Sequence, residues 1–274
     1  MTRPALDFAW RSDTGRVRAR NEDAIAVYEE QGLIVVADGI GGASAGHIAS
    51  QMATEIIGGR LLRQSSSRVD PRRSQLLIEA AVEEANGAIL ERAKRDEGCA
   101  RMGTTVVVGV FGDRWMSYTH VGDSRLYRLR ESRLEQLTND HSLIQEVVDL
   151  GFFPDLGEAR RYGINGNVLT RAVGSSSRVA ATTASTDLRD GDIYLFCTDG
   201  LTGSVNDDAL QFVLAAVPME TRLDVVANAL VHLAYQGGAS DNVTLALARV
   251  RRAGDDDDEQ GGSAGGDTIA SAPV

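Results

Sequence analysis

The sequence predicts an α+β fold in which helices cover antiparallel sheets. Short apolar segments rich in β-branched and aromatic residues follow one another along the chain, and the segments with helical periodicity come in separate pairs. Regular strand–helix–strand units, which would build a parallel sheet, are absent from this pattern. With 274 residues, 43% of them hydrophobic, the chain can bury one full core, and we expect a single domain.

The expected strands are short and are bounded by turn-forming residues. They lie, in chain order, at residues 6–13, 23–30, 33–38, 104–111, 114–122, 124–131, 179–185, 192–198 and 242–250. Gly-Asp dipeptides separate the three strands between residues 104 and 131. This spacing predicts a meander of neighbouring antiparallel strands.

The expected helices are marked by apolar residues at three- and four-residue spacing. In residues 43–62 the stripe consists of Ile48, Met52 and Ile56, with Ala45, Ala49 and Ala53 beside it. In the next helix it consists of Leu77, Ala81, Ala85, Ala88 and Ile89. Two more helices are expected within residues 207–235. Two short helices interrupted at residues 152–154 are expected within residues 141–167, and we interpret residues 144–167 as a flap.

Composition excludes several classes of partner. The net charge of −11 argues against a nucleic-acid backbone, which requires a surplus of Lys and Arg. No apolar run approaches the roughly 20 residues that span a bilayer, and the first ten residues lack the apolar core of a secretory signal, so we expect a cytoplasmic protein. Cys99 and Cys197 are far apart in sequence and are expected to be free thiols. Residues 1–252 form the predicted catalytic domain, and the acidic, Gly- and Ser-rich residues 253–274 are predicted to be a disordered tail.

Acidic residues recur at the ends of the expected strands. Asp38-Gly39 and Asp199-Gly200 each follow a buried strand pattern. Further acids flank strands at Glu22, Asp23, Asp123 and Asp241. Each of these sites taken singly could be only a turn, because Asp, Asn and Gly are common turn residues. Their repetition at strand ends favours a shared site.

If these strand ends meet, the carboxylates require cations or raised pKa values. Two like charges ~4 Å apart repel by roughly 4 kcal/mol at an effective dielectric constant near 20. No histidine or cysteine occurs at a suitable spacing, and oxygen ligands alone favour Mg²⁺ or Mn²⁺ over zinc. Gly39 has no side chain, so its carbonyl could approach such an ion directly.

Arg16, Arg18 and Arg20 lie immediately before the first of these acids. If this segment is extended, the three side chains share one face. A guanidinium beside a metal cluster is suited to bind a phosphoryl group, because its planar donors match phosphate oxygens. For Arg16 and Arg20, surface arginines that balance an acidic protein are an equal alternative.

Together, these motifs resemble those of metal-dependent protein phosphatases of the 2C type, the PPM family, and particularly its compact bacterial members. The motifs occur in the family's order, from about residue 7 to 250, and read VRARNEDA, VADGIGG, GTTVV, THVGDSRLY, DHSLIQE, VLTRAVG, CTDGLT and SDNVT. Each motif is weak alone, but the ordered set is specific.

The resemblance implies a four-layer sandwich of two antiparallel sheets flanked by helices, with the flap near the active site. It implies hydrolysis of phosphoserine and phosphothreonine in proteins by attack of a water that bridges two Mn²⁺ or Mg²⁺ ions, with a third, weaker ion nearby. The implied ligands are Asp38 as the bridge, Glu22, Asp23 and the Gly39 carbonyl for one ion, Asp199 and Asp241 for the other, and Asp123 with Asp199 for the third. Arg18 would bind the phosphate and Asn242 would support the ligands.

The resemblance also implies phosphorylated proteins as partners, among them a serine/threonine kinase and its substrates. We expect neither a nucleic-acid nor a membrane partner, and we expect a monomer. One position departs from the pattern: many relatives carry a histidine after the glycine pair, where this chain has Ala43, and the nearest histidine is His47. The general acid is therefore open between His47 and a metal-bound water. We interpret His120 and His141 as hydrogen-bonding supports.

Two alternatives remain at this point. Residues 42–46, Gly-Ala-Ser-Ala-Gly, match the nucleophile elbow of serine hydrolases, with Ser44 as the nucleophile. This interpretation leaves the carboxylates unexplained. The second alternative is a non-catalytic phosphate-binding regulatory module, which the missing histidine keeps open and the complete set of acids argues against.

Overall fold

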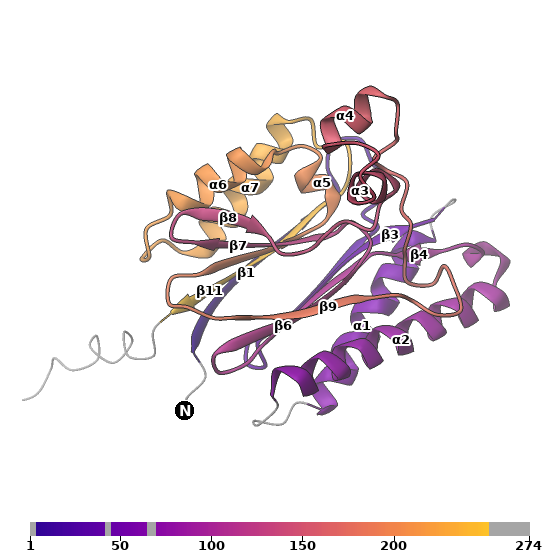
Figure 1. Ribbon diagram of the computed structural model, residues 1–274. Coiled ribbons are helices and arrows are strands. Elements are labelled where there is room, and N and C mark those ends of the chain that lie inside the picture. The colour runs from indigo at the N-terminus through magenta and orange to yellow at the C-terminus, as the bar shows by residue number, and fades with distance from the viewer. Residues whose placement is uncertain (1–3, 42–44, 65–69, 252–274) are drawn as a thin grey trace, which may run out of the picture.

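Two antiparallel sheets pack face to face in the computed structural model, which describes residues 4–41, 45–64 and 70–251 (Figure 1). The first sheet has the order β1 (Ala5–Asp13), β11 (Val243–Arg251), β10 (Ile193–Cys197), β7 (Arg125–Arg130) and β8 (Arg133–Gln136). The second has the order β2 (Asp23–Tyr28), β3 (Leu33–Ile40), β5 (Val106–Phe111), β6 (Trp115–Val121) and β9 (Thr182–Asp187), and β4 (Gly103–Thr104) pairs with β3.

Helices cover the outer face of each sheet (Figure 1). The long helices α1 (Gly46–Gln64) and α2 (Pro71–Arg95) lie against the second sheet, and α6 (Asp207–Ala215) and α7 (Leu223–Gln236) lie against the first. The short helices are η2 (Glu97–Cys99), α3 (Leu143–Asp149), α4 (Leu156–Arg161) and α5 (Asp199–Thr202). The predicted α+β class and the four-layer sandwich are confirmed.

The central strands are apolar along their whole length because both of their faces are buried. In β3, Val35 packs into the core beneath α1 and α2, whereas Ile34 and Val36 pack into the core between the sheets. In β10, Leu195 faces the helices and Phe196 faces the opposite sheet. The two cores therefore follow from the two-residue alternation of side chains along a strand.

Helix α2 has an N-cap aspartate, Asp70, followed by a proline in its first turn. The Asp70 carboxylate accepts a hydrogen bond from the Arg73 backbone N–H at 2.9 Å, and Pro71, which needs no donor there, occupies the first turn. The buried stripe includes Ile78 and Val82, which the predicted stripe omitted. The helix is thus rotated slightly from the expected orientation, because it packs on both α1 and β6.

The predicted meander is wrong at its third strand. β5 pairs with β6, but β7 lies in the other sheet, between β10 and β8. The chain crosses between the sheets at Gly122, which has φ of +98° and where a Cβ would lie 2.6 Å from the Thr105 side chain. A hairpin and a crossover both use Gly and Asp, so the dipeptide alone did not distinguish them.

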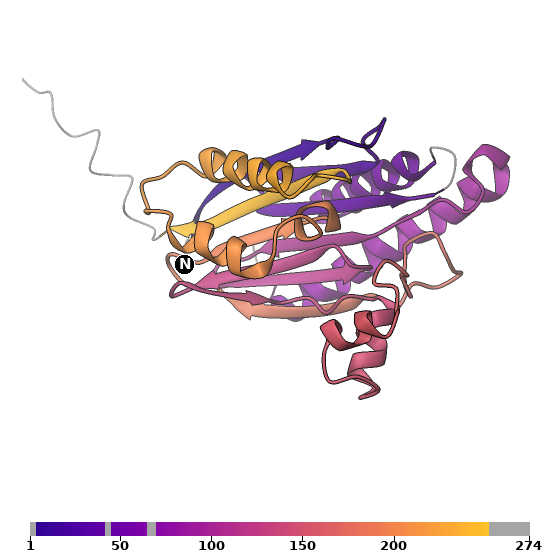
Figure 2. The ribbon, with the colours of Figure 1, turned by 90° about the horizontal axis from the view of Figure 1, so that it is seen from above.

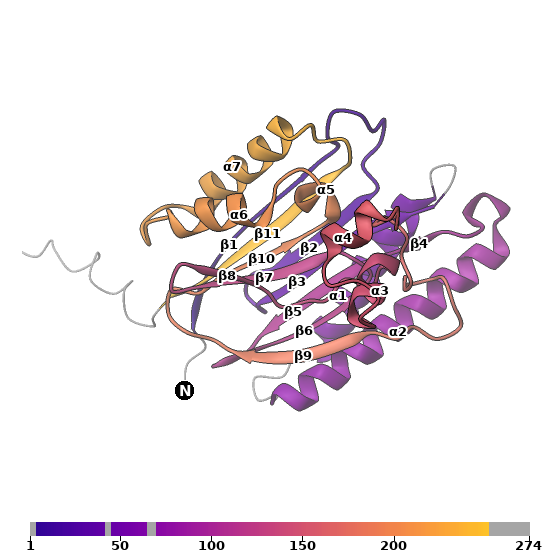
Figure 3. The ribbon, with the colours of Figure 1, turned by 45° about the horizontal axis from the view of Figure 1, so that its top comes forward.

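The flap segment, which we define as residues 144–167, contains most of α3 and all of α4, with the predicted break between them. Its two ends are joined, because the Leu143 N–H donates to the Val168 carbonyl at 2.8 Å. Figure 2 shows α3 and α4 projecting from the sandwich, and Figure 3 places them on the side where β4 and α5 lie.

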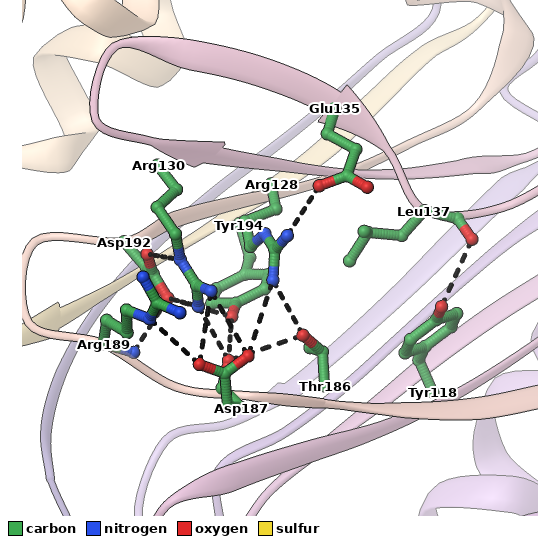
Figure 4. A network of polar contacts seen from close by, with 10 residues as sticks. All are labelled: Tyr118, Arg128, Arg130, Glu135, Leu137, Thr186, Asp187, Arg189, Asp192 and Tyr194. Atoms are coloured by element: carbon green, nitrogen blue, oxygen red, sulfur yellow. Dashed lines mark hydrogen bonds and ion pairs between the residues drawn. The ribbon is translucent and has the colours of Figure 1, made fainter.

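A network of arginines and aspartates joins β7 of the first sheet to β9 of the second (Figure 4). Arg130 on β7 donates to both oxygens of Asp192, at 2.8 and 2.6 Å, and to the Asp187 carbonyl at the end of β9 at 2.8 Å. Arg128 donates to the Thr186 hydroxyl at 2.8 Å. The side chain of Asp192 is only 1% exposed, so these partners replace the water that would otherwise solvate the carboxylate.

We expect Arg130→Ala to lower the free energy of unfolding by about 3–5 kcal/mol, because it leaves the buried Asp192 carboxylate without its cation. Urea unfolding measures the change. Arg189→Ala is the matched control, since the Arg189 side chain is 59% exposed and its ion pair should contribute less than about 1 kcal/mol. Equal losses of stability in the two variants would contradict a stabilising role for the buried ion pair of Arg130 with Asp192.

Candidate active site

The acidic residues at the strand ends converge at one edge of the two sheets. Asp23 and Asp38 stand opposite each other in the β2–β3 pairing. Asp199 follows β10 as the first residue of α5, and Asp241 precedes β11. Asp123 lies in the crossover from β6 to β7. Because β10 and β11 belong to the other sheet, this site is assembled only when the two sheets pack together.

Burial and mutual repulsion raise the pKa values of these carboxyl groups. The pKa of Asp38 lies well above its ordinary value, first because it is buried and then because Asp23, Asp199 and Asp123 lie nearby. Burial raises the pKa of Asp23 to about 7, even though the Thr198 hydroxyl donates to its carboxylate at 2.9 Å. Such shifts mean that the ionised form of these carboxyl groups is less favourable in the folded protein than in water.

The pKa values of Asp123 and Asp199 are raised too. For Asp123 burial raises the pKa to about 7, with a further contribution from Asp199. For Asp199 the pKa is raised by burial and then by the charge of Asp241, and its buried Oδ1 has no hydrogen-bond partner among the described residues. An unpaired buried oxygen among acids is a group that a cation would satisfy.

The donor set fits hard divalent ions, since it consists of carboxylates and backbone carbonyls. In the described part of the chain, no three acidic, histidine or cysteine side chains lie close enough together to coordinate one metal ion as they stand. We therefore expect bound ions to draw the carboxylates together, which would also relieve their repulsion.

Glycines let α1 start close to the acidic strand ends. A Cβ at Gly39 would lie 2.3 Å from the Gly46 carbonyl oxygen and 2.5 Å from that of Glu22. A Cβ at Gly46 would lie 3.1 Å from Glu22 Oε2. Glycine at position 39 is thus required by backbone packing, a reason separate from the predicted access of its carbonyl to an ion.

The three arginines before the acids do not share a face, because the extended segment on which that expectation depended does not form. Residues 15–17 form a turn rather than a strand, and the side chains diverge. Arg16 lies over the Tyr235 ring at 5.0 Å, Arg18 donates to Asp241 at 2.7 Å, and Arg20 contacts His47 at 3.3 Å. Within the described part of the chain, Arg18 is the one of the three that contacts a candidate ligand.

Asn242 ties the arginine turn to the strand end. Its side-chain amide donates to the carbonyls of Thr14 and Arg20 at 2.8 and 3.0 Å, and its oxygen accepts from the Glu22 N–H at 2.8 Å. Asn242 thereby holds the backbone on both sides of Arg18. Its support of the metal ligands stays a prediction.

The histidines occupy two different places. His47, at the start of α1, contacts Arg20 and makes no hydrogen bond to the candidate ligands within residues 4–41, 45–64 and 70–251. His120 and His141 stack with ring centroids 4.4 Å apart, and His141 Nδ1 accepts from the Gly122 N–H at 3.2 Å. Burial lowers the pKa of His141 to about 3, so the ring is neutral and serves as the hydrogen-bonding support that was expected. Ala43 and Ser44 lie outside the described residues.

Sequence reasoning missed the hydroxyl groups beside the acids. Thr198 donates to Asp23, and Thr105 Oγ1 accepts from the Asp38 N–H at 3.0 Å. Thr198 directly precedes Asp199 in the chain, which was the one available signal. It also missed the buried pair of Arg125 and Asp140, 2.7 Å apart, because the two residues are fifteen positions apart.

A sequence model of the protein phosphatase 2C family matches residues 15–231. The chain belongs to the protein phosphatase 2C family. Serine/threonine protein phosphatase PstP of Mycobacterium tuberculosis is 34% identical over 254 residues, covering 89% of this chain and 45% of PstP, so the chain spans about half of that relative. Serine/threonine phosphatase stp of Listeria innocua is 30% identical over 244 residues, covering 87% of this chain and 93% of that protein.

Solved structures of 2C-family phosphatases share the fold. The crystal structure of M. tuberculosis PstP has a TM-score of 0.80 at 33% identity, covering 90% of this chain and 99% of that one. A PstP catalytic domain in complex with two manganese ions has a TM-score of 0.78 at 33% identity, covering 90% and 98%. The predicted family is confirmed, and the predicted enzyme class is the one these relatives are named for.

Across the described residues, none of the helices combines the length and the apolar character that a membrane crossing requires.

Proposed function

We propose that this chain is a metal-dependent protein phosphatase that hydrolyses phosphoserine and phosphothreonine. The observation that carries the proposal is the convergence of five buried or half-buried aspartates, four of them with raised pKa values, at one edge of a 2C-family fold. A protein gains nothing in stability from such a cluster. The cluster is explained if cations occupy it during the reaction.

The proposed ligands follow the strand ends. Asp38 would contact two ions. Glu22, Asp23 and the Gly39 carbonyl would complete the site of the first, Asp199 and Asp241 that of the second, and Asp123 with Asp199 that of a third. When bound, Mn²⁺ or Mg²⁺ would lower the pKa of a water for in-line attack on phosphorus and offset charge on the phosphoryl oxygens.

The chain's own residues would bind and orient the phosphate. Arg18 is half-exposed and paired with Asp241, which is one of the proposed ligands. When a cation neutralises Asp241, the guanidinium becomes free to bind phosphoryl oxygens. Asn242 keeps Arg18 near the site through its contacts with Thr14 and Arg20. The proton for the leaving alcohol would come from a metal-bound water or from His47 after a change in its contact with Arg20.

Family membership supports catalysis over the regulatory-module alternative. A metal-dependent phosphatase also accounts for the cluster of carboxylates, which a serine hydrolase that uses Ser44 leaves unexplained. We further propose that phosphorylated proteins are the substrates, including those of a serine/threonine kinase, and that the protein acts in the cytoplasm. The catalytic domain is proposed to span residues 1–252. The tail assigned to residues 253–274 lies outside the described residues, and the monomeric state stays a prediction.

The proposed function predicts hydrolysis of a phosphothreonine peptide that depends on added metal. Phosphate release should be strong with Mn²⁺ or Mg²⁺ and should fall at least a hundredfold in excess chelator, because the acids alone have no means of activating water. Restoring the metal after chelation is the control for loss of folded protein. Full activity in chelator would reject the metal-dependent mechanism.

A further inference from the structure

A cleft of about 450 Å³ connects the acidic site with the flap segment. Asp123 and Asp199 line it, and so do residues of α3, α4 and the loop after α4. A peptide whose phosphoserine reached the acids would therefore place its neighbouring residues against the flap segment. This step rests on the proposed function.

One cation in this cleft has no partner among the residues that the structure describes. Arg125 also lines the cleft, but it is paired with Asp140 at 2.7 Å, and both side chains are largely buried. Arg160 on α4 lines the cleft as well, and within the described residues its side chain makes no hydrogen bond or ion pair. Arg160 therefore shares the cleft with Asp123 and Asp199 without being neutralised by either of them in the described part of the chain.

The neighbourhood of Arg160 leaves its guanidinium room to bind. The guanidinium lies over Gly166, where an added Cβ would be 3.8 Å from Arg160 Nε and 3.9 Å from Nη2. Glycine presents no side chain there to cover or neutralise the charge. An exposed guanidinium in a cleft offers a planar set of donors that fits a carboxylate or a phosphate.

We propose that Arg160 is a specificity-determining residue that binds a second anionic group on the substrate, beside the phosphoserine that is hydrolysed. The group is a carboxylate or a second phosphate on a neighbouring residue. The protein would then prefer acidic or multiply phosphorylated segments, although its own net charge of −11 disfavours such substrates over the rest of its surface.

The test uses phosphoserine peptides of one length with neutral flanks, with one aspartate, or with one further phosphoserine, placed at each of the three positions on either side. At its best position, the flanking anion should raise kcat/KM of the wild type about five- to twentyfold, and Arg160→Ala should remove that gain. Comparison of the peptides that carry aspartate with those that carry a second phosphoserine shows whether Arg160 prefers a carboxylate or a phosphate. The gain should also shrink at high salt.

Arg161→Ala is the matched control, because Arg161 is the next residue of α4, is exposed, and does not line the cleft. It should keep the preference for flanking anions. An aryl phosphate, which carries no second anion, should lose less than twofold in Arg160→Ala. Loss of the preference in Arg161→Ala, or no preference at any position in the wild type, would overturn the inference.

Failure of this inference and failure of the proposed function give different results. A wild type that hydrolyses the neutral peptide but ignores flanking anions keeps the function and loses the inference. If no peptide is hydrolysed, binding of fluorescent peptides measured by anisotropy still decides the role of Arg160. The peptide with two anions should then bind about five- to twentyfold more weakly to Arg160→Ala than to the wild type.

Discussion

Replacing Asp38 by asparagine should abolish hydrolysis and at the same time stabilise the metal-free protein. The activity should fall by at least a thousandfold, because Asp38 is proposed to contact two ions and asparagine is a poor bridging ligand. The metal-free protein should gain about 1–2 kcal/mol at pH 8, because the substitution removes a buried carboxylate that is repelled by Asp23, Asp199 and Asp123.

The pH dependence of this gain has a defined sign. The buried carboxyls have folded pKa values above the unfolded ones, about 7 for Asp23 and Asp123, so the folded state holds protons that the unfolded state has released. The metal-free wild type therefore loses stability as pH rises from about 4 to above 7. The advantage of Asp38→Asn should be small at pH 4 and largest at pH 8.

Urea unfolding in chelator at both pH values measures the stability effect, and phosphate release with Mn²⁺ measures the activity. Asp190→Asn, which changes an exposed acid in a turn, is the control and should change neither quantity. A metal-free Asp38→Asn protein that is less stable than the wild type at pH 8 would contradict the electrostatic description of the site. Retained activity would contradict the ligand assignment.

Replacing Arg18 by alanine should lower kcat/KM about ten- to a hundredfold without loss of metal affinity. A charge-assisted contact to a phosphoryl group is worth roughly 1.5–3 kcal/mol, which converts to that range. The cost in stability should be under about 1 kcal/mol, since the pair with Asp241 is 52% and 34% exposed. Arg18→Lys should recover only part of the activity, because a point charge does not reproduce the planar fork.

The neighbouring arginines supply matched controls for this assignment. Arg16 lies over the Tyr235 ring, so Arg16→Ala should lower the free energy of unfolding more than it lowers turnover. Arg20 contacts His47, so Arg20→Ala alters that contact and leaves the pair of Arg18 with Asp241 in place. If Arg20→Ala showed the larger loss in kcat/KM and Arg18→Ala showed none, phosphate binding would belong to Arg20.

The sequence by itself determined the elements and the chemistry of the acids. Short apolar runs indicated strands buried on both faces, because a strand covered on one face only would alternate apolar and polar residues. Asp38 and Asp199 were recognisable because each ends such a run and is followed by glycine. Ordered short motifs added the family, since their order along the chain carries more information than any one of them.

Only the tertiary structure decided how these pieces meet. The crossover at Gly122 sends β7 into the opposite sheet, and local turn residues do not encode that choice. The turn at residues 15–17 separates Arg18 from its neighbours, because Asn242, more than two hundred positions away, fixes that backbone. The presence of Arg160 in the same cleft as Asp199 likewise depends on how the flap segment packs. Contacts between residues far apart in sequence are set by the packing of whole layers, so local patterns do not contain them.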